Sequence, residues 1–526
     1  MNLCLALQTA QAPSPDINFA LILPETIVSV AGVLVMLVDA LLTRRKNQRW
    51  VTGLLSLFGL AAAAAVCFWL WNDQTTAREA FNGMIVLDRM RLSFTLVFLI
   101  VSALTVLVSM IWVEWENLPA GEFHSLLMFA TVGMMLMASG GDLVIIFLGL
   151  ELLSIATYVM AGFRRTDLRS NESSMKYFIL GAFSSAFLLY GIALIYGGTS
   201  LLNGGAGTTN IQELALRVGA ENALAYPALL YAGAALMLVG FGFKIATAPF
   251  HIWTPDVYEG APTPVTAFMA AGPKASGFAA FMRVFLIGFP FIAATTHAAQ
   301  IHTAWINALW LLAILTMTVG NLAALVQTNV KRMLAYSSIA HAGYALVGFI
   351  AAGQATDKTL QNDAIAAVAF YLLAYAVMNL GAFAVVTLIA RSGDRRTEIE
   401  DYNGIGFTAP ALSFALTLFL LSLLGIPLTA GFMGKVMVFR AALDQGFVVL
   451  VVIGVLNTAI SVYYYLRLVV VMFFRERSTA WSAPAVPVSI ALAIIITVLG
   501  VLYLGIFPGQ VLDAFRSEQS VVSQLK

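Results

Sequence analysis

Long apolar runs alternate along the chain with short connections that hold most of the basic residues. A helix of about 20 apolar residues is long enough to cross the hydrocarbon core of a bilayer. The pattern therefore predicts an all-α polytopic membrane protein with about 14 transmembrane helices. The predicted spans, in chain order, are 19–43, 51–71, 92–113, 123–140, 142–162, 174–196, 227–258, 263–289, 302–325, 333–352, 364–390, 409–443, 447–474 and 485–507.

Two of these runs, the seventh (227–258) and the twelfth (409–443), are too long to be single straight spans. At 1.5 Å per residue they would measure about 48 and 52 Å, against a hydrocarbon core of about 30 Å. Each run contains a proline beside glycine or other small residues, at Pro249 and Pro427. Spans 7 and 12 are therefore predicted to be discontinuous helices, whose freed backbone groups need protein or water as partners.

The composition supports a membrane protein and limits its chemistry. The chain is 60% hydrophobic and only 10% charged, whereas a soluble domain has about 25% charged residues. Its net charge of +1 argues against a nucleic-acid partner. The two cysteines, Cys4 and Cys67, lie in unrelated contexts, so they predict no disulfide, zinc or iron–sulfur framework.

The basic residues predict how the chain is oriented in the membrane. Fourteen of them fall in alternate connections on one side of the predicted spans, and seven fall on the other side. Because connections on the inner side of a membrane carry an excess of Lys and Arg, both termini are predicted to lie on the outer, periplasmic side.

Several ionisable residues fall inside the predicted spans, where a charge costs roughly 2.5–3.5 kcal/mol at mid-bilayer and so usually faces a protein or water-lined interior. Two of the lysines lie in the stretch 240–277, which also holds five prolines. Buried charge beside a broken helix is typical of an ion path, although a prolyl loop with two snorkelling lysines is an alternative. The six candidate path residues are Glu151, Lys176, Lys244, Lys274, His341 and Lys435.

Several of these residues also have a purely structural interpretation. Glu151, near the middle of the fifth span, is either paired with a cation or a neutral, hydrogen-bonded acid. Lys176 lies one turn into the sixth span and could simply reach the interface. His341 is either a proton relay or a satisfied core histidine. Lys435 follows the proline of the second broken span, much as Lys244 belongs to the first.

The order of elements predicts an internal repeat. Five spans separate the seventh from the twelfth, and also the span of Glu151 from that of His341. An odd offset makes the two sets run in opposite directions, as in inverted-topology repeats built from spans 4–8 and 9–13. The predicted divisions are a three-span segment (1–122), the two repeats (123–289 and 290–474) and a last span with its tail (475–526).

Four motifs carry a resemblance that covers most of the chain, from about residue 20 to residue 510. They are Gly149–Ser154, Phe243–Phe268, Lys331–Tyr344 and Pro427–Phe432. With them the chain resembles the antiporter-like membrane subunits of proton-pumping NADH–quinone oxidoreductase, respiratory complex I. Within that family the wording of the loop Arg169–Gly181, and a lysine at 435 where the M paralogue has a glutamate, are similar to the subunit N branch.

The resemblance implies a proton path. Glu151 and Lys244 would be the coupled acid–base pair of the first half-channel. Lys274 and His341 would continue a polar axis through the middle of the membrane. Lys435 would end it, passing charge to a neighbouring subunit or to the outside.

The resemblance also implies that Lys176 modulates the first pair. It implies a subunit of a translocase that binds no flavin, cluster or quinone itself, while NADH, FMN, iron–sulfur clusters and quinone are used elsewhere in the complex. The expected partners are the other membrane subunits of complex I, including the antiporter-like paralogues, and the lipid bilayer of a bacterial cytoplasmic membrane. Two other functions stay open: a subunit of a multisubunit sodium–proton antiporter, and a purely structural piece of the membrane arm.

Overall fold

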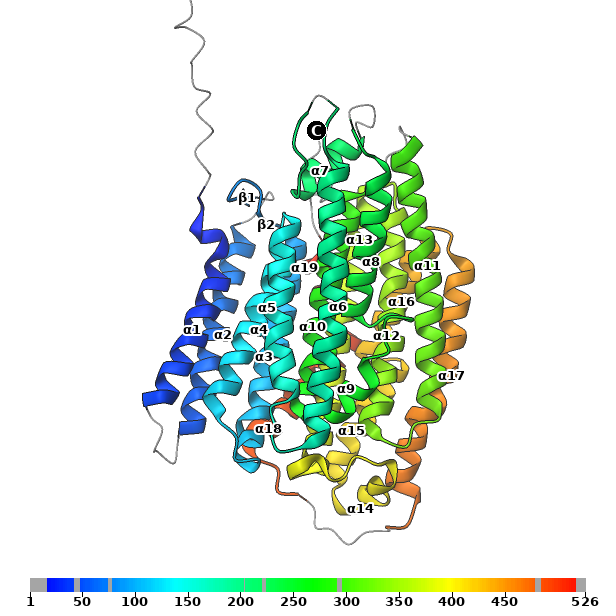
Figure 1. The fold of residues 1–526 in the computed structure, drawn as a ribbon. Helices are drawn as coiled ribbons and strands as arrows, with labels where there is room; N and C mark the ends of the chain where they lie inside the picture. The colour runs from blue at the N-terminus through cyan, green and yellow to red at the C-terminus, as the bar shows by residue number, and fades with distance from the viewer. Residues whose placement is uncertain are drawn as a thin grey trace, which may run out of the picture.

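The computed structural model describes residues 17–41, 48–73, 78–202, 204–219, 224–290, 296–477 and 484–516. Cys4 lies outside these residues, and Cys67 is buried. The chain forms a bundle of long helices that run between two ends, called here the upper and the lower end as they stand in Figure 1. The small hairpin and α7 cap the upper end, and α14 lies at the lower end.

The first three long helices form one side of the bundle. A short antiparallel hairpin connects the second to the third, with Glu79 opposite Val86. The elements of this segment are η1 (Phe19–Ile22), α1 (Leu23–Leu41), α2 (Gln48–Asn72), β1 (Arg78–Ala80), β2 (Ile85–Leu87) and α3 (Arg89–Trp115).

The first predicted repeat follows, and its seventh span is broken into α8 and α9. The long connection before α8 contains the short helix α7. The elements are α4 (Ala120–Ser139), α5 (Leu143–Ala161), α6 (Leu168–Gly198), α7 (Ile211–Gly219), α8 (Ala228–Ile245), α9 (Thr254–Gly260) and α10 (Thr263–Gly288).

The second predicted repeat has its own broken span, α15 and α16, and is followed by the last long helix. The elements are α11 (Thr296–Leu325), α12 (Val330–Gln354), α13 (Lys358–Ala390), η3 (Ser392–Asp394), η4 (Ile399–Tyr402), α14 (Ile405–Thr408), α15 (Pro410–Leu424), α16 (Ala430–Asp444), α17 (Val448–Phe474), α18 (Val488–Ile506) and α19 (Pro508–Phe515).

The prediction of an all-α polytopic membrane protein is confirmed. Among the described residues, 12 helices are long and apolar enough to cross a membrane. The other two predicted spans correspond to α10, which is one continuous helix, and to the broken pair α15–α16, whose interruption lies at Pro427 as predicted. The number of helices that cross the membrane, predicted as fourteen, stays a prediction.

Equivalent helices of the two predicted repeats have equivalent neighbours. α4 packs on α5 and α10, as α11 packs on α12 and α17. This packing is what inverted repeats require. The division of the chain into repeats and flanking segments stays a prediction.

The helix α10 lies at the centre of the bundle, because every residue from Thr263 to Gly288 is buried. Its Arg283 donates to both carboxylate oxygens of Asp88, at 2.7 and 2.9 Å, and to the carbonyl of Ala138 at 2.9 Å. Asp88 in turn caps α3 by accepting from the Arg91 backbone at 2.7 Å. Arg283, which the sequence left without a role, therefore ties α10 to the first segment at the upper end.

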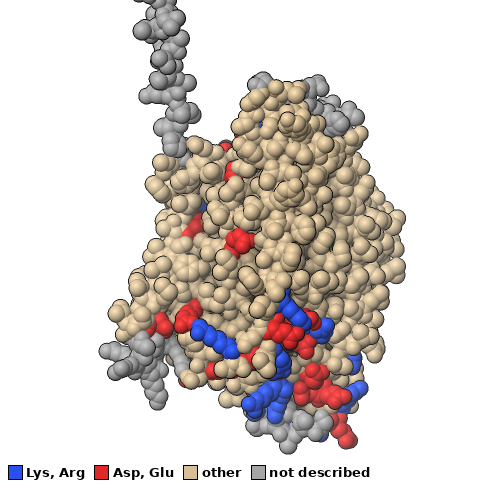
Figure 2. All heavy atoms as spheres, in the orientation of Figure 1, with Lys and Arg blue, Asp and Glu red and all other residues tan. Residues whose placement is uncertain are grey.

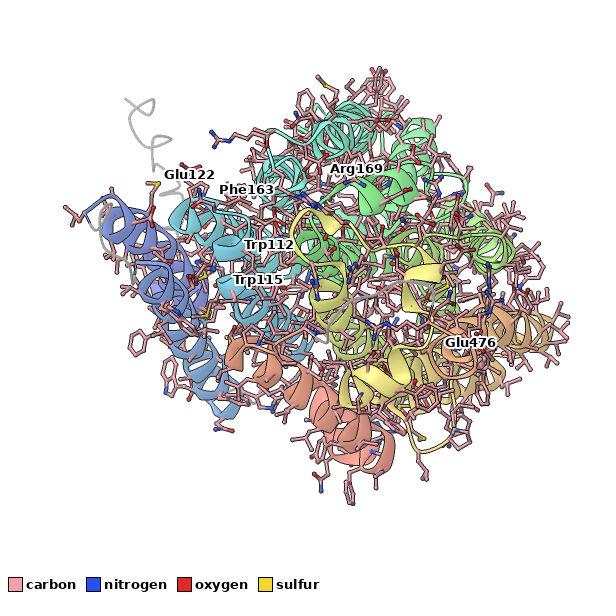
Figure 3. The ribbon with its side chains drawn as sticks, turned by 90° about the horizontal axis from the view of Figure 1, so that it is seen from below. Trp112, Trp115, Glu122, Phe163, Arg169 and Glu476 are labelled. Carbon is pink, nitrogen blue, oxygen red and sulfur yellow. The ribbon has the colours of Figure 1, made fainter. Side chains whose placement is uncertain are left out.

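Charged side chains gather at the lower end of the molecule. In the face shown in Figure 2, Lys and Arg are concentrated there beside Asp and Glu, and the broad band above is mostly uncharged apart from a few charged side chains on its left part. Figure 3, seen from below, shows labelled residues of this end: Glu122 at the beginning of α4, Arg169 at the beginning of α6 and Glu476 just after α17. An uncharged band above a charged end is the surface that a bilayer requires.

Candidate functional site

Lys244 lies where the upper half of the first broken span, α8, comes to an end. α8 ends at Ile245, and Ala246 follows in the left-handed region with φ of 61°. Lys244 therefore lies in the last turn of α8, and its side chain is buried. A cation is favourable there because the last carbonyl groups of a helix carry partial negative charge.

Lys244 reaches across to α5, where it meets a hydroxyl rather than a carboxylate. Its Nζ donates to Ser154 Oγ at 2.9 Å. Glu151 lies one turn before Ser154 on the same helix, and its Oε1 is buried without a hydrogen-bond partner. No ion pair within 4.0 Å joins these two described residues, Glu151 and Lys244. The structure therefore brings Lys244 to the helix of Glu151 and adds Ser154, which sequence reasoning missed although it lies inside the Gly149–Ser154 motif.

A small pocket opens onto this contact between α5, α6 and α8. It has a volume of about 10 Å³, which is on the scale of the space that one water molecule needs. Lys244 and Ser154 line it together with Ser184 and Ser185 of α6. With Tyr158, its walls offer an ammonium and four hydroxyl groups, which are suitable partners for a water molecule.

Lys176 lies elsewhere, in the charged lower end. Its Nζ pairs with Glu172 at 2.7 Å and with Asp256 of α9 at 2.8 Å, and the side chain is 42% exposed. Asp256 also accepts from Arg332 of α12 at 2.6 Å. Lys176 thus links α6 to α9, the lower half of the first broken span. Its two ion pairs are with Glu172 and Asp256, and neither involves Glu151.

Lys274, from the middle of α10, points to α12. Its Nζ donates to the backbone oxygen of Ser338 at 2.6 Å and to its hydroxyl at 2.5 Å. The same ammonium lies 5.9 Å from the centre of the Tyr375 ring. Lys274 is fully enclosed by these groups, since its exposed fraction is 2%.

His341 lies on α12 with a tyrosine hydroxyl at each ring nitrogen. Tyr371 of α13 lies 2.7 Å from Nδ1, and Tyr465 of α17 lies 3.3 Å from Nε2. The ring of Tyr375 is 5.0 Å from the imidazole and 5.9 Å from the Lys274 ammonium, so it neighbours both residues. Sequence reasoning missed these tyrosines because aromatic residues in an apolar helix are usually core.

Lys435 reaches back across the second break. It belongs to α16, but its Nζ donates to the carbonyls of Leu423 and Leu424 at 3.1 and 2.8 Å. These carbonyls end α15, whose helix stops at Gly425 with φ of 100°. The ammonium therefore satisfies groups that the break leaves without intrahelical partners. It also lies 4.8 Å from the centre of the Tyr344 ring.

Each broken span thus has a buried lysine near its break, but the two lysines belong to different halves of their spans. Lys244 belongs to the half-helix that ends at the break, while Lys435 belongs to the half-helix that begins there. Lys244 belongs to the last turn of α8, at the carbonyl end of that half-helix, and the Lys435 ammonium bonds to the carbonyl end of α15. Positive charge beside a helix carbonyl end is stabilised by the helix dipole.

A buried ionic cluster at the lower end holds the helices that carry the path residues. Asp394 accepts from Arg164 at 2.5 Å, Lys331 at 3.1 Å and the Thr263 hydroxyl at 2.7 Å. These partners precede α6 and begin α12 and α10. Burial by itself would raise the pKa of Asp394, but Lys331 and Arg164 outweigh burial and hold that pKa below its usual value.

The arrangement is suited to moving protons between fixed groups. It offers an unpaired carboxylate oxygen, three buried lysines, one histidine and several hydroxyl groups, all of which can exchange protons. Among the residues that the structure describes, no three His, Cys, Asp or Glu side chains lie close enough to hold a metal ion.

Comparison of the whole chain with known proteins agrees with the resemblance of the four motifs. A family model described as "NADH:quinone oxidoreductase/Mrp antiporter, TM" matches residues 140–461. A protein named NADH-quinone oxidoreductase subunit N from Trichlorobacter lovleyi is 47% identical over 503 residues, which cover 94% of this chain and 96% of that protein.

Solved structures agree on the fold. A chain of respiratory complex I from Thermus thermophilus with bound aureothin is 35% identical, with a TM-score of 0.74, and the match covers 94% of this chain and 99% of that chain. A chain of the Mrp complex from a Dietzia species gives a TM-score of 0.78 at 19% identity, over 95% of this chain and 96% of that chain. The second likeness shows the fold alone.

The resemblance expected from the four motifs is therefore confirmed at family level. The family model spans both broken helices and all six candidate path residues. This chain belongs to the family of NADH:quinone oxidoreductase and Mrp antiporter transmembrane subunits, in the group whose curated members are named NADH-quinone oxidoreductase subunit N.

Proposed function

We propose that this chain is an antiporter-like, proton-translocating membrane subunit of NADH–quinone oxidoreductase. The observation that carries the proposal is the pair of broken helices, each with a buried lysine beside the carbonyl end of a half-helix. Lys274 on α10 and His341 on α12 lie between them. The proposed path runs from Glu151 and Lys244 through Lys274 and His341 to Lys435.

The mechanism is electrostatic. Burial disfavours a charged ammonium, and a nearby carboxylate favours it. A change in the charge or position of Glu151 therefore changes how tightly Lys244 holds its proton. Moving one charge against 100 mV needs about 2.3 kcal/mol, a requirement well within what such shifts supply. That work comes from redox chemistry in partner subunits.

Lys176 takes part indirectly in this proposal. Its ion pair with Asp256 holds α9, the lower half of the span that carries Lys244. A Ser173–Val257 hydrogen bond at 2.9 Å also joins α6 to α9, so breaking the ion pair would loosen α9 rather than detach it, and would alter the break beside Lys244. This supports a modulating role for Lys176 rather than a place in the path itself.

We infer that this chain binds no flavin, iron–sulfur cluster or quinone, and that NADH, FMN, clusters and quinone are used by the rest of the complex. Its partners are the other membrane subunits, including the antiporter-like paralogues. The membrane is the bacterial cytoplasmic membrane, with both termini on the periplasmic side. The charged lower end supports this orientation, since basic residues accumulate on the inner side.

Replacing Lys244 with Ala tests the function directly. The assembled complex should still reduce quinone but should lose proton pumping, measured in inverted membrane vesicles by quenching of a pH-sensitive dye. Lys358→Ala is a matched control, because Lys358 is an exposed lysine at the first turn of α13. Normal pumping by an assembled Lys244→Ala complex would sink the assignment.

A subunit of a multisubunit sodium–proton antiporter is the second candidate, because the matching family model and the Mrp structure include such proteins. The two candidates differ in their partners. Purification in mild detergent should recover flavin and iron–sulfur subunits with this chain. Recovery of a sodium-dependent antiporter assembly without them would favour the second candidate.

A further inference from the structure

His341 lies between two lysines but bonds to neither. Lys274 donates to Ser338, and Lys435 donates to the carbonyls at the end of α15. The hydroxyl groups of two tyrosines, Tyr371 and Tyr465, are hydrogen-bond partners of the imidazole. A proton that passes between the lysines through His341 therefore needs a carrier on each side of the ring.

The two tyrosines are placed to be those carriers. Tyr371 comes from α13 and Tyr465 from α17, and their side chains are buried together with the imidazole. A neutral imidazole has one donor and one acceptor nitrogen. One tyrosine therefore donates to the ring while the other accepts from it, and the three groups form a hydrogen-bonded chain with a direction.

On one side this chain approaches Lys274. The hydroxyl of Tyr465 shares a hydrogen bond with Ser337 Oγ at 2.5 Å. Ser337 is followed in the chain by Ser338, whose hydroxyl accepts from Lys274 at 2.5 Å. Lys274 and Tyr465 therefore bond to the hydroxyl groups of two consecutive residues of α12, Ser338 and Ser337.

On the other side the chain approaches Lys435. Tyr371 packs against Gly434, the residue before Lys435, so closely that a Cβ at Gly434 would lie 3.0 Å from the tyrosine ring. A glycine at that position lets α13 lie directly against α16. Tyr371 thus joins the imidazole to the helix that carries the last lysine of the path.

We propose that Tyr465 and Tyr371 are proton carriers of the second half of the path, in the order Lys274, the Ser337–Ser338 pair, Tyr465, His341, Tyr371 and Lys435. This proposal rests on the proposed function. In each transfer, a hydroxyl oxygen gains one proton and gives up another, and His341 takes a proton on Nε2 as it releases one from Nδ1. No direct hydrogen bond joins the described side chains of Ser338 and Ser337, or of Tyr371 and Lys435, so a water molecule is proposed to carry the proton across each of these two gaps. One proton moves in total, and no other bond changes.

The test replaces each tyrosine with phenylalanine, which removes the hydroxyl and keeps the ring. Tyr371→Phe and Tyr465→Phe should each lower the proton-pumping rate of the assembled complex about tenfold or more, since a positioned acid–base group contributes on the order of 10²–10⁴ to a proton-transfer step. Tyr402→Phe is the matched control: Tyr402 is also buried, and its hydroxyl has no hydrogen-bond partner.

Pumping by both path variants at the level of Tyr402→Phe would overturn the proposal. The function itself would still stand if Lys244→Ala abolishes pumping in the same vesicles. Where a phenylalanine variant fails to assemble, a fluorinated tyrosine at the same position decides, because it keeps the packing and makes the hydroxyl more acidic. A carrier role shifts the pH profile of pumping, and an unshifted profile with full pumping contradicts it.

Discussion

The Lys244 ammonium donates to the Ser154 hydroxyl at 2.9 Å, one helical turn from Glu151. The acid–base pair implied by the resemblance is therefore not a direct ion pair in this structure. A hydroxyl holds the lysine, while the Glu151 carboxylate keeps one buried oxygen without a partner. The carboxylate thus acts on the lysine through space, and the serine sets where the ammonium lies.

Ser154→Ala removes the hydrogen-bond acceptor of Lys244 and leaves the helix intact. An unmet hydrogen bond on a buried group costs about 1–3 kcal/mol, so the balance between the two protonation states of Lys244 should change. The expected result is a loss of about tenfold in pumping rate with an assembled complex, measured in vesicles alongside quinone reduction. Ser184→Ala is the control, because Ser184 lines the same pocket and donates instead to Gly240. Equal rates in the two variants would contradict the role of Ser154.

Lys435→Ala should destabilise the protein as well as stop pumping. The substitution leaves the carbonyls of Leu423 and Leu424 without their ammonium partner, at about 1–3 kcal/mol for each buried group. A lower thermal unfolding temperature of the purified chain is expected. Lys435→Gln should recover part of that stability, because an amide can still donate, and none of the pumping. Recovery of pumping by the glutamine variant would show that Lys435 carries no proton.

Asp394→Asn should lower the free energy of unfolding at neutral pH by weakening the packing of the lower end. Breaking a buried ion pair costs about 3–5 kcal/mol, and here two buried cations, Arg164 and Lys331, lose their shared partner. Chemical unfolding in detergent measures the difference. Asp513→Asn, at an exposed pair with Arg516, should change stability little.

The pH dependence of stability distinguishes Asp394 further. Its folded-state pKa is lower than the usual value of 3.8, so its contribution is fully present above that usual value. The contribution is lost as the pH falls through the folded-state pKa. The unmodified chain should therefore lose stability below about pH 4, and Asp394→Asn should lose less over the same window. Parallel curves for the two proteins would exclude this assignment.

Arg283→Lys should weaken the upper end, because a lysine cannot form the two parallel hydrogen bonds that Arg283 gives to Asp88. A loss of about 3–5 kcal/mol in unfolding free energy is expected for Arg283→Met, which leaves the carboxylate unpaired. Adding Asp88→Asn to Arg283→Met should cost little more, since the pair is already broken. Fully additive losses would show that the two residues act independently.

The sequence by itself determined the class of fold, the broken spans and the candidate path residues. These follow from local rules: run length decides whether a helix can cross a bilayer, and proline interrupts it wherever it lies. The cost of a charge at membrane depth then singles out the few ionisable residues inside the runs, such as Lys244 and Lys435. None of this depends on which helices are neighbours.

Only the tertiary structure decided the partners of those residues. Ser154 and Lys244 are 90 residues apart, and Tyr465 and His341 are 124 apart, so helix packing alone brings them together. α10 is buried on every side, so its apolar pattern has no single inward face from which a neighbour could be inferred. The ion pair of Lys176 could not be predicted either, because its partner Asp256 lies on α9, whose position is set by the break in the seventh span.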